Sequence, residues 1–414
     1  MVIDSLLPPG QVRIHQDNWS WCVMLVSQRQ ESSEISVTAV QIIVNTCHVH
    51  TIGLETLFLI RSEKMKPMRM GTKSGTGLEI TVTDSIEDVE RDRWNSVVEL
   101  VDQGSVFHRY EWLQAIEAGL GYPARHLQVT KDGNVIGIWP NFVTDLYESP
   151  FGRLTSMYPG FGGPLITTDT KESLGALIER IPDICATGTV VHEIRANENG
   201  YLQYTNLLES RGYRPTRDGC RIQLELSDGY DAVRKGMSRS RQRGIERGRQ
   251  HDCEITERTL TPRNIYQFYG AYRQVMDRVG GDALPLSFLE KLSGMESRLL
   301  LVTLELDGEY AGGMLEVLNE EQSTVYGFLK AVPEQYFEYN ASELLYDYVI
   351  QWGIEHGYET YDMGYTPADF ENGLFQFKKS FGGHIVPNLF WERGCSPVWP
   401  LVRAGREIYS LYYK

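Results

Sequence analysis

Three arginines stand out in this acidic chain because of their spacing. Arg239, Arg243 and Arg247 recur every four residues within a basic stretch, which places them on one face of a helix. A row of guanidinium groups binds phosphate oxygens, such as those of a nucleotide-linked substrate or an RNA-borne donor. The alternative is a solvated helix whose arginines pair with nearby acidic residues. Two glycines in the stretch weaken the prediction of a stable helix.

Asp362 is a second candidate, at the end of the predicted strand Tyr358–Met363. A helix with one apolar face precedes the strand over Asn340–His356, and Gly357 ends it. Ligand sites commonly lie at the carboxyl ends of core strands, although Asp362 capping the next turn is an equal alternative. A carboxylate held near a cation can accept the proton that an attacking amine loses. Asp362 is therefore a candidate general base.

The elements that must position these residues follow a regular order from Leu78 onward. A short strand is predicted over Glu79–Val82, followed by a helix that Ser85 introduces. After a second short helix, Asp132-Gly133 forms the turn of a hairpin whose second strand is Val135–Phe142. A helix and a final strand, Val190–Arg195, complete the series.

The same order appears again in the second half. Thr261-Pro262 opens a helix, and Asp307-Gly308 forms the turn of a second hairpin. The helix after each hairpin carries a capping signal, Asp169 with Glu172 in the first half and Asn340 with Glu343 in the second. We therefore predict two related lobes, over residues 77–225 and 226–414. Each is an α/β unit with a mixed, partly antiparallel sheet flanked by helices.

Three motifs occur in order near the C-terminus: Asp362-Met363-Gly364, Gly373-Leu374 and Phe377-Lys378-Lys379-Ser380-Phe381-Gly382-Gly383. Their order resembles the C-terminal signature of the Fem-type (FemAB-like, CelD/BioF-like) branch of the GNAT acyltransferase superfamily. The first half resembles the N-terminal lobe of that branch at Val106–Leu113, at Asp132-Gly133 through Pro140, and at Tyr158–Pro164. The resemblance covers nearly all of residues 78–395 and none of 1–70.

The resemblance implies two tandem GNAT folds and transfer of an acyl or aminoacyl group to an amine. It places Lys378 near the reacting carbonyl, where a fixed cation stabilises the developing oxyanion. A surface cation is the alternative for Lys378, and Phe377 and Phe381 are expected to anchor it from the core. Tyr158 and Tyr326 are candidate substrate contacts or, alternatively, packed sheet tyrosines.

The acyl donor stays open between aminoacyl-tRNA and acyl-CoA. GNAT enzymes bind the coenzyme A pyrophosphate on a turn with the pattern Gln/Arg-x-x-Gly-x-Gly/Ala. Two segments of this chain stand at the corresponding places but match the pattern poorly, Gln335–Ala341 in the second lobe and Gly162-Gly163-Pro164 in the first. This departure favours aminoacyl-tRNA. The acceptor is an amino sugar, a cell-envelope precursor or a peptide amine. The alternatives are an acetyl-CoA-dependent N-acetyltransferase of surface polysaccharide biosynthesis, or a non-catalytic module that binds nucleotide-sugars or polymers.

The composition restricts the setting in which the protein acts. The net charge is −15, and the chain has 29 arginines and 11 lysines. This composition favours a surface adapted to high salt, with an ordinary acidic protein as the alternative. The negative charge also makes duplex DNA a poor partner. No run of about 18 apolar residues predicts a membrane span, and no secretory signal is evident. The six cysteines form no Cys-x-x-Cys pair, so we expect reduced thiols and a cytoplasmic location.

Residues 1–76 differ from the rest in their weak periodicity. We predict a poorly ordered extension or an over-long start, with a small β-rich unit as the alternative. Cys47-His48 and His50 are residue types that bind metals, but no second pair accompanies them. We therefore predict no metal site.

Overall fold

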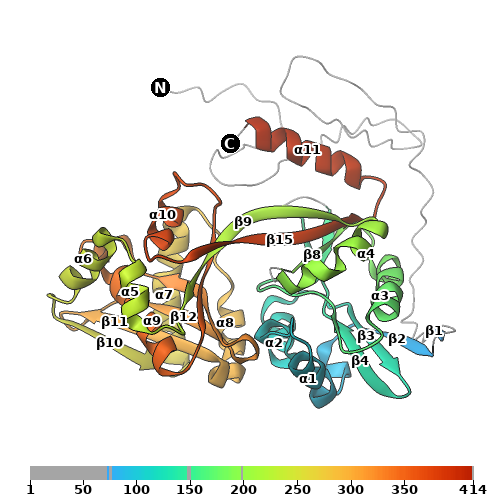
Figure 1. Cartoon of the computed structure of the whole chain (residues 1–414), viewed down its shortest axis with the longest axis horizontal. Coiled ribbons are helices and arrows are strands. Elements are labelled where there is room, and N and C mark those ends of the chain that lie inside the picture. Colours follow the sequence, from blue (N-terminus) through green and yellow to red (C-terminus); the bar gives the residue numbers. More distant parts are fainter. Residues whose placement is uncertain (1–71, 74–76, 147–150, 197–198, 413–414) are drawn as a thin grey trace, which may run out of the picture.

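The computed structural model describes residues 72–73, 77–146, 151–196 and 199–412 (Figure 1). Apart from strand β1 (Thr72–Lys73), the predicted N-terminal extension lies outside the described residues. The Cys47-His48 motif lies outside them as well.

The first half follows the predicted order, including the hairpin. Its turn residues Asp132 and Gly133 both have positive φ, 51° and 80°, which suits a two-residue turn between twisted strands. The predicted strand Val135–Phe142 is wrong in one respect, because it breaks after Trp139, where Pro140 offers no N–H to the ladder. The elements are β2 (Leu78–Thr83), α1 (Arg91–Leu100), α2 (Tyr110–Leu120), β3 (His126–Lys131), β4 (Asn134–Trp139), β5 (Phe142–Asp145), β6 (Gly152–Thr155), β7 (Leu165–Ile166), α3 (Thr170–Ile184), β8 (Thr189–Arg195) and α4 (Thr205–Ser210).

The second half repeats this order with longer strands. Its hairpin turn, Asp307-Gly308, again has positive φ at both residues. The elements are β9 (Arg214–Glu225), α5 (Tyr230–Gly236), α6 (Arg239–Gly248), β10 (Cys253–Arg258), α7 (Pro262–Val279), α8 (Leu286–Leu292), β11 (Leu299–Leu306), β12 (Glu309–Asn319), β13 (Thr324–Ala331), α9 (Ala341–Glu355), β14 (Thr360–Thr366), α10 (Gly373–Lys379), β15 (His384–Gly394) and α11 (Trp399–Tyr412).

The strands form two sheets. One has the order β1-β2-β3-β4-β7, and the other has the order β10-β11-β12-β13-β14-β9-β15-β8-β6-β5. Each half contains one parallel pair whose connection includes a helix: β6 with β8 through α3, and β13 with β14 through α9. The predicted fold class, two related α/β lobes with mixed sheets, is confirmed.

Two long strands, β9 and β15, join the lobes (Figure 1). β9 lies between β14 and β15, and β15 pairs on its other edge with β8 of the first lobe. The larger sheet is therefore continuous across both lobes. β9 ends at Glu225, the residue at which the sequence predicts the end of the first lobe. The strand nevertheless pairs with β14 and so forms part of the sheet of the second lobe.

The helix caps differ from the predicted ones. Asp169 and Asn340 do precede α3 and α9, but both have left-handed φ values (49° and 58°), and neither side chain caps its helix. The Asp169 carboxylate instead pairs with Lys131 at 2.6 Å, so the predicted capping boxes are wrong. Thr261 does cap α7, because its hydroxyl accepts the amide N–H of Asn264.

The two glycines of the basic helix have a packing role. Gly244 and Gly248 are both buried on the side of α6 that packs against α9. A Cβ atom on Gly248 would lie 2.8 Å from Leu344 of α9, closer than side-chain packing allows. The glycines therefore favour the position of α6 in the fold, although they lower its intrinsic helix propensity.

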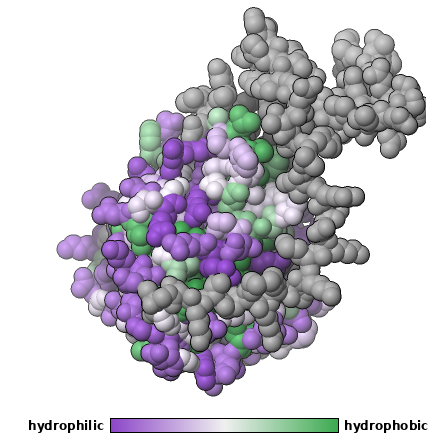
Figure 2. Space-filling model, turned by 90° about the vertical axis from the view of Figure 1, so that its right-hand side faces the viewer, coloured by the Kyte–Doolittle hydropathy of each residue, from purple (hydrophilic) through white to green (hydrophobic). Residues whose placement is uncertain are grey.

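The described helices and one face of the surface show how apolar the outside of the molecule is. No helix within the described ranges is long and apolar enough to cross a membrane. On the first-lobe side the visible face is mostly hydrophilic, with small separate apolar spots (Figure 2). This face accords with the acidic composition.

The first prediction concerns Gly382, which follows α10. Its φ is +98°, and a Cβ atom there would lie 2.5 Å from backbone atoms of Gly236. Gly382→Ala is expected to lower the free energy of unfolding by about 1–3 kcal/mol, measured by urea denaturation. Gly373→Ala is the matched control, because no atom lies within 4 Å of its added Cβ. Equal stability of the two variants would contradict the close approach.

Candidate active site

The centre of the second lobe is a point where two parallel strands part. β13 and β14 pair through Thr324–Thr360, Val325–Tyr361 and Tyr326–Asp362, and the ladder ends there. A bulge in the neighbouring β12–β13 ladder falls at the same level, beside Glu316. Beyond this point β14 continues along β9 alone, so the strand ends are free to present side chains and backbone groups to a ligand.

A polar cavity of about 270 Å³ lies beside the last paired residues. It opens between the lobes, because Asp102 and Phe161 come from the first lobe and the other lining residues from β9, β14 and the β12–β13 region. The lining residues are Asp102, Phe161, Arg221, Gln223, Asn319, Gln322, Thr324, Tyr326, Thr360 and Asp362. Such a cavity suits a polar ligand.

Asp362 lies buried in the wall of this cavity, with both carboxylate oxygens occupied. Oδ2 forms an ion pair with Arg221 and accepts a hydrogen bond from Gln223 Nε2 at 2.9 Å. Oδ1 accepts the backbone N–H of Gly364 at 2.9 Å. Both oxygens are therefore already engaged by donors of the fold. These contacts favour a positioning role over the general base expected from the sequence.

Lys378 lies near Asp362 and is only 5% exposed. Its Nζ donates hydrogen bonds to the carbonyl oxygens of Gly364 (3.1 Å) and Tyr365 (2.5 Å). The backbone of Gly364 thus contacts both residues, because its N–H binds Asp362 and its carbonyl oxygen binds Lys378. Burial lowers the pKa of Lys378 to about 8, while the carboxylates of Asp362 and Glu316 oppose this shift. An ammonium group has three N–H donors, and the hydrogen bonds of Nζ to described residues use two of them.

Two further ionisable groups, the Glu316 carboxyl and the Lys330 amine, are buried in the second lobe. Burial raises the pKa of Glu316 to about 8, while Lys330 and Lys378 oppose the shift. Tyr361 donates a hydrogen bond to one carboxyl oxygen of Glu316, and the other oxygen has no partner among the described residues. Lys330 Nζ lies 3.5 Å from the ring centroid of Tyr346, and burial lowers its pKa.

These two residues, together with Arg221 and Gln223, are not among the site residues predicted from the sequence. A signal was present, since Glu316 and Lys330 each interrupt an apolar run, and Arg221 and Gln223 alternate with apolar residues along one strand. What the sequence could not show is that the interruptions meet in space.

The two predicted tyrosines have different surroundings. Tyr326 lines the polar cavity and packs against Phe107 and Phe161 of the first lobe, with ring centroids 5.3 and 5.1 Å away. Tyr158 is not among the residues that line the cavity. It lies in the first lobe, where the guanidinium groups of Arg153 and Arg195 are each 5.5 Å from its ring centroid.

The predicted arginine face exists on α6. Arg239, Arg243 and Arg247 are exposed, and none of them forms an ion pair with a described residue. Arg241 points the other way. It pairs with Glu343 and lies 4.0 Å from the ring centroid of Phe377, next to Lys378.

This arginine holds α6 against the segment that carries Lys378. Arg241 Nε donates to Ser380 Oγ at 2.9 Å, and the guanidinium group also lies 4.8 Å from the ring centroid of Phe381. Phe381 is fully buried, and Phe377 packs against it at a centroid distance of 5.5 Å. Both phenylalanines therefore anchor the segment between α6 and the core.

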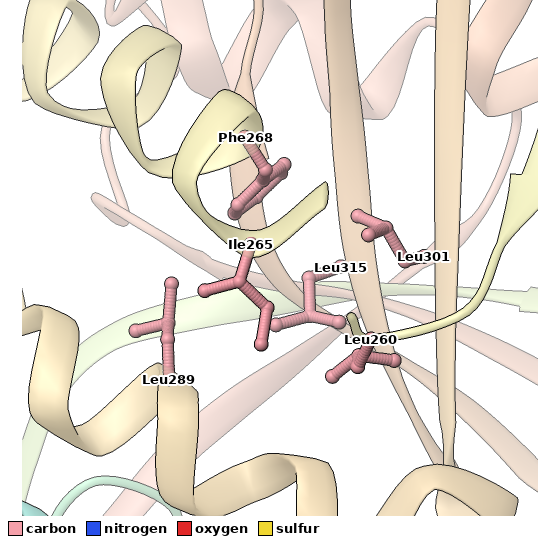
Figure 3. A pocket seen from close by; sticks show the side chains of 6 residues that line it. All are labelled: Leu260, Ile265, Phe268, Leu289, Leu301 and Leu315. Carbon is pink, nitrogen blue, oxygen red and sulfur yellow. The ribbon is translucent and has the colours of Figure 1, made fainter. Parts of the chain in front are cut away.

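A second, smaller gap in the second lobe is purely apolar. Figure 3 shows the six side chains around it: Leu260, Ile265, Phe268, Leu289, Leu301 and Leu315. At about 10 Å³ the gap is no larger than a packing defect between α7, α8 and the sheet. Without a polar group it cannot orient a ligand, which leaves the interlobe cavity as the better candidate of the two.

Comparison with known proteins agrees with this geometry. Residues 232–379, which include α6, β13, β14 and Lys378, match the family model of the acetyltransferase (GNAT) domain. The crystal structure of FemX superposes with a TM-score of 0.60 at 14% identity, covering 79% of this chain and 99% of FemX. The chain shares the two-lobed fold of FemX, and part of its second lobe matches the GNAT domain model. The predicted resemblance is thereby confirmed.

Two further solved structures share this fold. L-PGS from Bacillus licheniformis superposes with a TM-score of 0.52 at 13% identity, over 77% of this chain and 96% of its own. The C-terminal domain of a putative lysylphosphatidylglycerol synthetase from Agrobacterium fabrum gives 0.50 at 12%, over 78% and 97%. No curated protein sequence matches the chain. The parting of β13 and β14 thus lies within the residues that match the GNAT domain model.

The second prediction concerns the pH dependence that Glu316 gives to stability. Its pKa is 4.5 as an unperturbed group and about 8 when folded. Between these two pKa values the folded state therefore keeps a proton that the unfolded chain loses. The contribution of Glu316 to the free energy of unfolding is greatest below about pH 4.5 and is lost as the pH rises to about 8. Relative to wild type, Glu316→Gln should gain stability over this range, by at most about 1.4 kcal/mol per pH unit.

Urea denaturation at a series of pH values measures this difference. Glu320→Gln is the control, because Glu320 is exposed on the neighbouring turn. Wild-type and Glu316→Gln curves that stay parallel between pH 5 and 8 would show that Glu316 is not held protonated.

Proposed function

We propose that this GNAT protein transfers an acyl or aminoacyl group to an amine, with the reacting carbonyl next to Lys378. The observation that carries the proposal is the position of Lys378. It is a buried ammonium group at the parting of β13 and β14, within the matched GNAT domain. Attack of an amine on a carbonyl carbon places negative charge on the carbonyl oxygen. A fixed, desolvated N–H donor stabilises that charge without reorganisation.

The surrounding contacts fix the direction in which Lys378 can donate. Two of its protons are directed at the carbonyl oxygens of Gly364 and Tyr365, so the third points along a defined line. Asp362 supports this arrangement, because it holds Arg221 and the Gly364 amide in place. We assign Asp362 to positioning, and Lys378 to direct contact with the reacting oxygen.

The acceptor amine fits the polar interlobe cavity best. Asp102 contributes a carboxylate to its wall, and Tyr326 contributes a phenol group beside Asp362, whose charge is already paired with Arg221. Carboxylates attract an ammonium group, and hydroxyl and amide groups orient the rest of a polar molecule. An amino sugar, a cell-envelope precursor or a peptide amine all carry these features. Tyr158, between two arginines, is a further candidate contact for an anionic part of the acceptor.

The donor we favour is aminoacyl-tRNA. The exposed arginine face of α6 offers three guanidinium groups that form no ion pair with a described residue, and Arg241 connects the same helix to the Lys378 segment. A phosphate backbone bound there would bring its aminoacyl end toward Lys378. The fold shared with a putative lysylphosphatidylglycerol synthetase supports an aminoacyl group, since lysyl is one. Acyl-CoA is the competing donor.

The third prediction tests Lys378. Lys378→Met keeps the apolar stem but removes the donor, and is expected to lower the rate of transfer by about 100–1000-fold. The assay combines the purified chain with panels of aminoacyl-tRNA and acyl-CoA donors and amine acceptors, with products detected by mass spectrometry. Lys379→Met is the matched control, because Lys379 is exposed and binds only the carbonyl of Gly383. A Lys378→Met enzyme as fast as wild type would refute the mechanism.

The fourth prediction tests the arginine face of α6. Replacing Arg239, Arg243 and Arg247 with Gln should weaken binding of charged tRNA and flatten its salt dependence, by roughly 0.7–0.9 in log–log slope for each lost phosphate contact. Acyl-CoA binding should not change. Arg263→Gln with Arg273→Gln, two exposed arginines of α7, provides the control. Filter binding at several salt concentrations measures both, and equal loss in the control would rule out a specific face.

A further inference from the structure

Two cysteines that are 210 residues apart in sequence lie next to each other in the structure. Cys185 directly follows α3 of the first lobe, and Cys395 directly follows β15. Their Sγ atoms are 2.8 Å apart. Both side chains are partly buried, and both are free thiols.

The backbone around both sulfurs is held in place. The N–H of Cys395 donates to the carbonyl oxygen of Val190 in β8 at 2.9 Å, and the N–H of Cys185 closes the last turn of α3 on Ile181. Arg393, two residues before Cys395, donates to the carbonyl oxygen of Ile178 in the same helix. The sulfurs need to approach by less than about 1 Å to reach the bond length of a disulfide, about 2.05 Å.

The pKa values of the two thiols are shifted in opposite directions, so one of them can act as the attacking thiolate in disulfide formation. The hydrogen bond with Cys395 and the positive charge of Arg393 lower the pKa of Cys185, although burial opposes the shift. The same hydrogen bond, together with burial, raises the pKa of Cys395. Cys185 is therefore the sulfur that reaches the nucleophilic thiolate form first.

We propose that Cys185 and Cys395 form an oxidation site, whose co-reactant is a small-molecule disulfide. The Cys185 thiolate attacks one sulfur of that molecule, forms a mixed disulfide and releases one small thiol. Cys395 then loses its proton and attacks Sγ of Cys185, which releases the second small thiol and leaves the Cys185–Cys395 bond. The protein gives up two electrons and two protons, and the small disulfide takes both up.

The bond would fasten the strand that follows the proposed reaction centre. β15 begins five residues after Lys379, the last residue of α10, and ends next to Cys395. Its far end would then be tied covalently to α3 of the first lobe, and the long enclosed loop would restrict the unfolded chain. In a reducing compartment the pair stays open, so the site responds to the redox state of its surroundings.

The test uses the purified full chain, incubated with oxidised glutathione or with a reductant, then alkylated and digested without reduction. We expect one linked peptide pair that contains Cys185 and Cys395, and loss of alkylation at both. The unfolding midpoint of the oxidised chain should rise by about 5–10 °C over the reduced chain. Full alkylation of either cysteine after oxidation, or links to other cysteines instead, would overturn the proposal.

Two variants separate the bond from general effects of oxidation. Cys185→Ser should abolish the linked pair and the difference in midpoint, whereas Cys253→Ser, a partly buried thiol of β10, should keep both. If Cys185→Ser fails to fold, peptide mapping of wild type and Cys253→Ser still decides the matter. A linked pair without a rise in midpoint would refute the fastening of β15. None of these readouts depends on acyl transfer, so they stand apart from the proposed function.

Discussion

The buried ion pair between Arg221 and Asp362 joins the parts of this molecule that matter for its chemistry. Arg221 comes from β9, and it also donates to Asn388 of β15 at 3.1 Å and lies 5.3 Å from the ring centroid of Phe161 in the first lobe. Burying two charges is costly unless geometry and additional hydrogen bonds compensate, and here Gln223 and the Gly364 amide supply them. The pair therefore fixes β9 between β14 and β15, and the interlobe cavity forms beside it.

Around this fixed pair lies a second set of ionisable groups that is less well compensated. Glu316 and Lys330 each keep a buried polar atom without a hydrogen-bond partner among the described residues. Such groups weaken a fold when they serve no ligand, because desolvation is not repaid. Their concentration where β13 and β14 part accords with the proposed site, because one buried lysine there can stabilise an oxyanion and the pKa values of Lys378 and Glu316 lie near neutrality.

The basic helix α6 connects this centre to the surface. Its inner arginine, Arg241, lies against Phe377 and Phe381 and bonds Ser380, while its outer arginines face solvent. The glycines that pack it against α9 set the distance between the two helices. One helix thus presents a row of exposed arginines on one side and supports the Lys378 segment on the other. This arrangement is the structural reason for favouring an RNA-borne donor.

The sequence by itself determined the local elements and the order of the motifs. Asp-Gly turns specify tight hairpins through their own backbone preferences, and the apolar periodicity of α9 identifies it without reference to any partner. It also singled out Lys378, Asp362 and the arginine face of α6. Only the tertiary structure decided what these residues touch, because the partners are distant in sequence: Arg221 with Asp362, Arg241 with Phe377, and Glu316 with Tyr361. The capping residues show the same limit, since Asp169 binds Lys131 across the fold in place of its own helix. Local propensity is read from neighbouring residues, whereas charge pairing depends on which strands lie side by side.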